Sequence, residues 1–160
     1  NRRQSTEALY ISNYHKAKLM KPVKVKSVIA NFELKNKNLK SEQVLEANNK
    51  KKLIGLMSSS CNYSMAAIPL LEKINLEGKE QLDIVTIWDD SSYDTWQNYR
   101  SEKKSNISWK NLWDEYGFAV NYFDRTLTPT FFVVDEDGKV LQKFSGFDKK
   151  TVKKITALIN

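Results

Sequence analysis

One residue of the chain could act as a sulfur nucleophile, the single cysteine Cys61. A short apolar run, Leu53 to Met57, and the serines 58–60 precede it, and apolar side chains recur at helical spacing after it. This order predicts a buried strand that leads through N-cap serines into a helix, with Cys61 at or next to its start. Free N–H groups and the positive end of the helix dipole favour a thiolate at such a position. The alternative is a cysteine that only fills space in the core.

Two proline-containing segments give Cys61 a recognisable context. Pro69 follows the cysteine by eight residues and lies inside the predicted helix, where a proline costs about 3 kcal/mol. Far downstream, Thr128-Pro129-Thr130 leads into the apolar run 131–134 and the charged turn 135–139. Taken in order, these features resemble the thioredoxin fold, and within it the extracytoplasmic TlpA/ResA-like branch of thiol-disulfide oxidoreductases. The resemblance extends over residues 30 to 160.

The sequence departs from this family at the active-site motif. Relatives carry W-C-x-x-C, whereas this chain has Ser60 before Cys61 and Ser64 in place of the second cysteine, which gives C-x-x-S. Gly55 and Ala67 stand where relatives often place a polar or acidic group that manages protons. A two-cysteine redox cycle therefore cannot run within this chain. Whether Ser64 is natural or introduced stays open at the level of the sequence.

The resemblance also implies a set of site residues. The catalytic set would be Cys61, Ser64 and Pro129, with Pro129 in the cis conformation beside the thiol and Ser64 donating a hydrogen bond to the thiolate. The partner-binding set would be Asn62, Tyr63, Thr128 and Trp88. Trp88 belongs here because it ends a strand on the same edge of the sheet as Cys61, and ligands gather at the carboxyl ends of such strands. The backbone of Thr128 would pair with an extended partner segment.

The function implied by this site is thiol-disulfide exchange through one thiol. Cys61 would form a mixed disulfide with a protein thiol or disulfide partner, and an external thiol would resolve it. No cofactor and no metal are expected. The alternative is a non-catalytic thioredoxin-fold module that binds partners through the same groove and has lost redox turnover.

Other chemistries lack their motifs. The sequence has no phosphate-binding G-x-x-x-x-G-K-[ST] or G-x-G-x-x-G, no cysteine pair for zinc and no H-E-x-x-H. A Cys-His hydrolase would need a histidine near Cys61, but the one histidine, His15, falls in the polar N-terminal stretch. A peroxiredoxin motif is incomplete, because Ser58 provides its hydroxyl position but Ile54 stands where its proline should be.

Composition and charge narrow the class of protein further. The 160 residues suit one domain with a real core, and the net charge of +7 reflects lysines spread along the whole chain. With no recognition motif among them, these lysines indicate a solvated surface, and no nucleic-acid partner is expected.

No stretch is long and apolar enough to cross a bilayer, and no signal-type segment is present. The first residue is Asn1 rather than Met, so we expect a processed piece whose missing N-terminal segment could anchor it to a membrane. One cysteine leaves the compartment open. An extracytoplasmic location, in the periplasm or cell envelope, follows from the resemblance.

The expected fold is α/β, a thioredoxin-like mixed sheet with helices on both faces and an N-terminal strand extension. Residues 1–22 would be a lead-in or linker, and 23–160 the domain. Strands are expected around 23–27, 32–35, 39–40, 53–57, 82–88, 131–134 and 140–144, and helices at 41–46, after Asp89 to Ser92 and after Asp148. For 107–123 the family pattern favours a short extended piece at 107–109 and a helix at 118–123, whereas side-chain periodicity alone favours a helix over 109–116.

Overall fold

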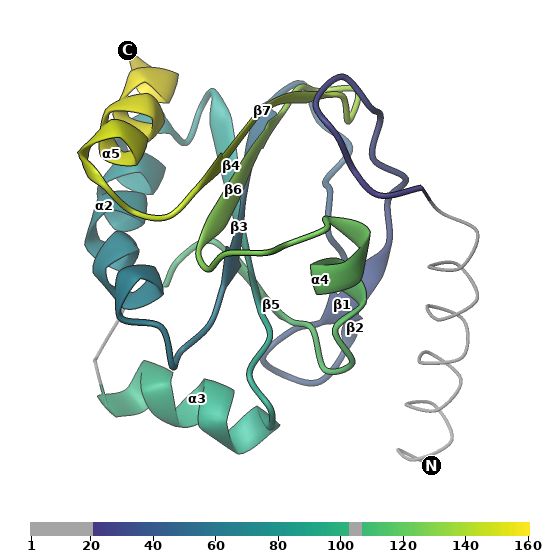
Figure 1. Ribbon diagram of the computed structural model, residues 1–160, viewed down its shortest axis with the longest axis vertical. Helices are drawn as coiled ribbons and strands as arrows, with labels where there is room; N and C mark the ends of the chain where they lie inside the picture. Colours follow the sequence, from purple (N-terminus) through teal and green to yellow (C-terminus); the bar gives the residue numbers. More distant parts are fainter. Residues whose placement is uncertain (1–20, 103–106) are drawn as a thin grey trace.

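The computed structural model describes residues 21–102 and 107–160 (Figure 1). Most of the predicted lead-in, including His15, therefore lies outside the described residues. The strands are β1 (Glu33–Lys35), β2 (Ser41–Gln43), β3 (Lys51–Met57), β4 (Leu82–Trp88), β5 (Lys110–Trp113), β6 (Thr130–Val134) and β7 (Val140–Ser145). The helices are α2 (Asn62–Gly78), α3 (Tyr93–Glu102), α4 (Phe118–Tyr122) and α5 (Lys149–Thr156), and the 3-10 turn η1 (Ala157–Ile159) follows α5. None of the described helices is long and apolar enough to span a bilayer.

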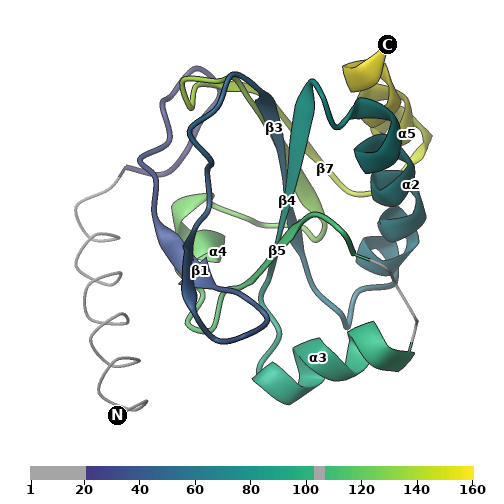
Figure 2. The same cartoon turned by 180° about the vertical axis from the view of Figure 1, so that it is seen from behind.

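The strands form one mixed sheet in the order β2-β1-β5-β4-β3-β6-β7. The central strand β3 pairs in parallel with β4 and antiparallel with β6. Helices α2 and α5 cover one face, and α4 lies on the other (Figures 1 and 2). This arrangement confirms the thioredoxin-like α/β class, and the β1–β2 hairpin is the strand extension at its N-terminal side.

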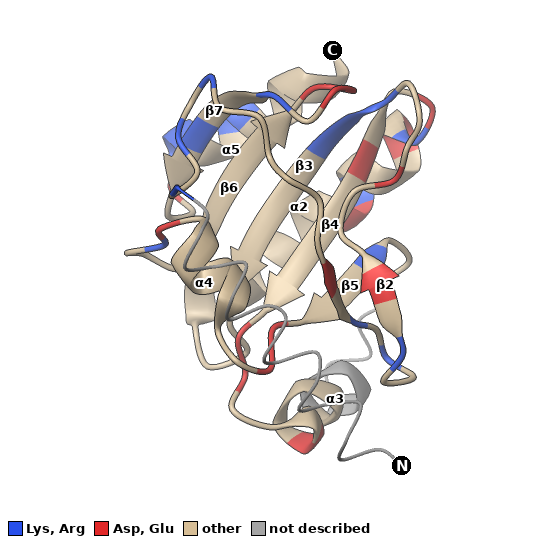
Figure 3. Ribbon diagram, turned by 90° about the vertical axis from the view of Figure 1, so that its right-hand side faces the viewer, with Lys and Arg blue, Asp and Glu red and all other residues tan. Residues whose placement is uncertain are grey.

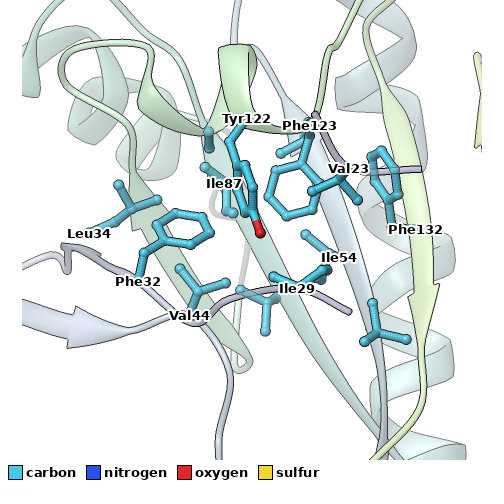
Figure 4. Packing of buried hydrophobic residues seen from close by; sticks show 14 of the residues in the cluster. Val23, Ile29, Phe32, Leu34, Val44, Ile54, Ile87, Tyr122, Phe123 and Phe132 are labelled. Carbon is cyan, nitrogen blue, oxygen red and sulfur yellow. The ribbon is translucent and has the colours of Figure 1, made fainter. Parts of the chain in front are cut away.

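A separate apolar cluster fills the space on each face of the sheet. Beneath α2 and α5, the buried side chains include Leu71, Ile74 and Ile155. On the α4 side, aliphatic side chains surround a group of aromatic rings, and the ring centroids of Phe123 and Phe132 lie 4.8 Å apart (Figure 4). Strand β3 contributes to both clusters because it is buried on both faces, which explains its continuous apolar sequence.

Two short predicted elements near the N-terminus are wrong. Residues 23–27 form a turn rather than an edge strand: Lys26 has a φ of 76°, and the Ser27 hydroxyl oxygen accepts a hydrogen bond from the Lys24 N–H at 2.9 Å. Residues 41–46 do not form a helix, because Ser41–Gln43 is β2 and pairs antiparallel with β1. Asn36 stabilises the hairpin turn by accepting hydrogen bonds from the N–H groups of Asn38 and Lys40.

The structure also decides between the two alternatives for 107–123. Residues 110–113 form β5, which pairs in parallel with β4, and α4 begins at Phe118 after Gly117, whose φ is 70°. The helix predicted at 118–123 is confirmed, whereas the extended piece is displaced, because the strand covers 110–113 rather than the predicted 107–109. The helix over 109–116 is wrong, because pairing with β4 outweighs the local periodicity.

We expect Leu53→Ala to destabilise the fold strongly, because Leu53 is fully buried in the central strand. Loss of its side chain should lower the free energy of unfolding by about 2–5 kcal/mol. Denaturant titration would measure this change. The matched control is Leu76→Ala on the exposed side of α2, where we expect a change within about 0.5 kcal/mol. Equal effects of the two substitutions would contradict the assigned core.

Candidate functional site

The single cysteine lies where the sequence predicts it, at the N-terminus of the helix that follows β3. Cys61 is the N-cap residue of α2, with φ −98° and ψ 115°, and its side chain is half-buried. Its Sγ donates a hydrogen bond to the carbonyl oxygen of Thr128, at 3.3 Å. The serines 58–60 do not cap the helix as predicted, because the cap position belongs to Cys61 itself.

The Thr128 carbonyl comes from a loop that precedes β6. The Thr128–Pro129 peptide bond is cis, and Pro129 is buried. The Pro129 carbonyl accepts a hydrogen bond from the Gly146 N–H at 2.7 Å, which ties the loop to the end of β7. Thr130 then opens β6 opposite Leu56 of β3. The nucleophile loop (residues 58–61) and the Thr128–Pro129 loop thus meet at the carboxyl end of β3.

Ser64 occupies a different environment from the one expected. It is 0% exposed, and its Oγ accepts a hydrogen bond from the Ser58 N–H at 3.2 Å. Among the described residues, no hydrogen bond joins Ser64 to the Cys61 sulfur, which donates to the Thr128 carbonyl. The hydroxyl at the position of the second cysteine therefore acts on the nucleophile loop rather than on the thiol.

The residues predicted to contact a partner divide into two groups. Asn62 and Tyr63 are exposed on the first turn of α2, with Tyr63 65% exposed, and Thr128 is half-buried beside the thiol. Trp88 is 1% exposed, and its Nε1 donates to Asn111 Oδ1 inside the sheet, so it cannot contribute to a partner surface in the folded chain. Leu127, 60% exposed next to Thr128, was missed by the sequence analysis although it directly precedes the Thr-Pro pair.

An acidic side chain beside the nucleophile loop was also missed. Asp90 follows the carboxyl end of β4 and is 5% exposed, and its Oδ1 accepts hydrogen bonds from both the N–H and the hydroxyl of Ser59. Burial raises the pKa of this carboxyl. The sequence predicts that residues 89–92 cap the next helix, and of these Ser92 does so, because its Oγ accepts a hydrogen bond from the Thr95 N–H at 3.1 Å.

A second buried carboxyl lies at the end of β5. Asp114 Oδ2 accepts a hydrogen bond from the Val120 N–H of α4 at 3.1 Å, and burial raises the pKa of Asp114 to about 6. Nearby, Asp89 is paired with Arg125. Acidic residues thus gather where β4 and β5 end, whereas lysines are concentrated around β7 and α5 (Figure 3). The described residues contain no group of three or more side chains that could hold a metal ion.

Comparison with known proteins places the chain in a family. The profile of the Redoxin family matches residues 17–159. The chain belongs to the Redoxin family. No curated protein sequence matches it significantly.

Several solved structures show the same fold at low sequence identity. A thiol:disulfide interchange protein DsbE from Chlorobium tepidum is 16% identical, with a TM-score of 0.78 over 86% of this chain and 96% of that one. StoA from Bacillus subtilis is 15% identical, with a TM-score of 0.66 over 81% and 99% of the two chains. The exposed lipoprotein thioredoxin Etrx1 from Streptococcus pneumoniae is 19% identical, with a TM-score of 0.64 over 80% and 99%.

The buried carboxyl of Asp114 predicts a pH dependence of stability. Its pKa is raised in the folded chain from 3.8 to about 6, so the folded chain keeps a proton that the unfolded chain has released. The neutral carboxyl stabilises the fold fully at pH values below the pKa of the unfolded chain. This stabilisation is lost as the pH rises through the pKa of the folded chain. Asp114→Asn keeps a hydrogen-bond acceptor for α4 but cannot ionise. We therefore expect its free energy of unfolding at pH 7 to exceed that of the parent by on the order of 2 kcal/mol.

Denaturant titrations of the parent and Asp114→Asn at several pH values between 4 and 7 would measure this difference. The control is Asp124→Asn at an exposed position, which should leave the pH profile of the parent unchanged. Parallel profiles for the parent and Asp114→Asn would contradict the raised pKa.

Proposed function

We propose that this protein takes part in thiol-disulfide exchange through Cys61 alone, in an extracytoplasmic compartment. The observation that carries the proposal is the position of Cys61: a half-buried thiol at the N-terminus of α2, 3.3 Å from the Thr128 carbonyl beside the cis peptide bond. Membership of the Redoxin family supports sulfur chemistry at this position. The exposed lipoprotein thioredoxin of the same fold supports the location.

The exchange has two steps. In the first, the Cys61 thiolate attacks one sulfur of a partner disulfide, a bond forms between Cys61 Sγ and that sulfur, and the other partner sulfur leaves as a thiolate. In the second, an external thiolate attacks the partner sulfur of this mixed disulfide, and Cys61 leaves as a thiolate. The partner sulfur ends in a disulfide with the external thiol. Cys61 is regenerated without net oxidation.

The external thiol is needed because the chain contains no second cysteine. In a C-x-x-C protein the second thiol resolves the mixed disulfide at the high effective concentration of an intramolecular group. Ser64 cannot perform this attack, and its hydroxyl is engaged with the Ser58 N–H. The mixed disulfide should therefore live longer than in a two-cysteine relative.

The surface around Cys61 fits a protein partner in an extended conformation. Tyr63 and Leu127 are exposed apolar side chains on the two segments that meet at the thiol. An extended segment laid across them could place a cysteine at Cys61 while its backbone pairs with that of Thr128. The partner would be recognised by its backbone and by apolar side chains next to the reacting sulfur.

The second candidate function is a binding module without turnover. The full burial of Ser64 favours it, because a side chain that serves the packing of the loop does not require a reactive thiol next to it. Such a module would use Tyr63, Leu127 and Thr128 to hold a partner, and Cys61 would be incidental. The two functions differ in the reactivity of Cys61.

The rate of Cys61 alkylation against pH should distinguish them. If Cys61 is the nucleophile, we expect the rate to reach half of its maximum clearly below about 8.5, the value of an ordinary thiol. The same chain unfolded in urea is the control, because it contains the same cysteine without the helix. A folded-state midpoint equal to that of the unfolded control would favour the binding module.

We expect Ser64→Cys to create a dithiol that closes to a disulfide, because positions 61 and 64 are neighbours across the first helical turn. Its turnover with a disulfide substrate should rise well above that of the parent, since the second thiol can resolve the mixed disulfide. The cost is the hydrogen bond from the Ser58 N–H, worth about 1–3 kcal/mol when its acceptor is removed from a buried site.

Mass spectrometry of the oxidised variant and a turnover assay would test this expectation. The matched control is Ser64→Ala, which loses the same hydrogen bond without gaining a sulfur, so its turnover should stay at the low level of the parent. Two free thiols in oxidised Ser64→Cys would show that the proposed geometry of exchange is wrong.

A further inference from the structure

The nucleophile loop is held by buried polar side chains from two different elements. Ser64, from α2, accepts a hydrogen bond from the Ser58 N–H. Asp90, from the segment after β4, accepts hydrogen bonds from the N–H and the hydroxyl of Ser59 through one carboxylate oxygen. These contacts fix the two residues of the loop that lead from β3 toward Cys61.

Asp90 is itself held firmly in place. Its carbonyl oxygen accepts a hydrogen bond from the Trp113 indole at 2.8 Å, and the preceding Asp89 N–H donates to the Met57 carbonyl at the end of β3 at 3.2 Å. The stacked indoles of Trp96 and Trp113, with ring centroids 6.3 Å apart, pack on this side of the sheet. The carboxylate is therefore a fixed acceptor rather than a mobile surface group.

Burial of this carboxylate is unfavourable for the fold by itself. A charge taken out of water is costly unless partners compensate for the loss of hydration, and Asp90 Oδ2 has no hydrogen-bond partner among the described residues. If Asp90 served only to fill space, an apolar residue could replace it without the cost of burying a charge. The buried carboxylate therefore indicates another role for this side chain. The contacts of its other oxygen indicate which one.

We propose that Asp90 is a positioning residue for Cys61, whose carboxylate holds Ser59 and so keeps Cys61 at the N-cap of α2 with its sulfur against the Thr128 carbonyl. The proposal rests on the function proposed above, because it concerns the reactivity of that thiol. Asp90 touches neither the sulfur nor a partner. It acts through the backbone and hydroxyl of Ser59.

The alternative explanation is that Asp90 affects Cys61 through its charge alone. The charged and titratable groups around Asp90 determine in which direction this would shift the alkylation midpoint. Asp89 is adjacent in the chain and is paired with Arg125, Asp114 follows Trp113 on β5, and Cys61 follows Ser59 by two residues. A negative charge at Asp90 opposes a second negative charge on the sulfur. If Asp90 acted through charge alone, its removal would lower the alkylation midpoint of Cys61. Loss of positioning would raise it.

The test compares Asp90→Ala with Asp90→Asn by following the alkylation of Cys61 by iodoacetamide against pH. Asp90→Ala removes the acceptor of both Ser59 hydrogen bonds, and we expect it to raise the midpoint and slow alkylation at neutral pH roughly tenfold. Asp90→Asn keeps an acceptor oxygen without the charge, so its rate should stay close to that of the parent or exceed it. Equal midpoints for the two variants would overturn the proposal.

Milder variants cover the case in which Asp90→Ala does not fold. Ser59→Ala removes one of the two donors, and we expect a smaller shift of the midpoint in the same direction, whereas Ser59→Thr keeps the hydroxyl and should restore the parent value. Asp94→Asn, at an exposed position on α3, is the control for loss of one negative charge. If Ser59→Ala lowers thermal stability but leaves the midpoint unchanged, the contact is structural and the proposal fails.

These measurements tell failure of the positioning role apart from failure of the proposed function. A parent midpoint equal to that of the unfolded chain would remove the exchange function itself. A low parent midpoint that Asp90→Ala and Ser59→Ala leave unchanged would remove only the positioning role of Asp90.

Discussion

The pairing of β3 on both of its sides is the constraint on which the site depends. Parallel pairing with β4 makes the two strands end at the same edge of the sheet, and antiparallel pairing with β6 starts β6 at that edge. The segment that follows β3 carries Cys61, and the segment that precedes β6 carries Thr128. Residues 67 positions apart in the chain thereby come within hydrogen-bond distance. The burial of β3 in both apolar clusters keeps this register fixed.

Polar side chains, rather than a second sulfur, organise the loop between β3 and α2. Ser64 and Asp90 are both buried, and each satisfies a backbone N–H of the loop. Buried polar groups carry a cost when they are left unpaired, so such a network has few alternative arrangements. The C-x-x-S motif is therefore compatible with a well-defined loop. In the proposed exchange a single thiol reacts, and the lifetime of the mixed disulfide would depend on an external thiol.

The accessible part of the site is smaller than the set of residues that the family pattern indicates. Tyr63 and Leu127 present apolar surface on the two sides of the thiol, whereas Trp88 is part of the interior. Trp88 shares the Asn111 side-chain oxygen with Thr86, a buried residue of the same strand, which explains why the indole stays inside. Partner recognition would therefore depend on the loops and on the first turn of α2, and not on the strand end.

The sequence by itself determined the segments whose structure is set by near neighbours. The apolar run 53–57, the helical spacing after Cys61 and the Asp137-Gly138 turn between 131–134 and 140–144 place β3, α2 and the β6–β7 hairpin, because burial and turn chemistry there act over a few residues. Tertiary structure decided the rest. Residues 41–43 form a strand because they pair with β1. Asp90 accepts hydrogen bonds from Ser59 of the nucleophile loop rather than capping a helix. These outcomes depend on hydrogen bonds between segments distant in the sequence, which local propensity does not encode.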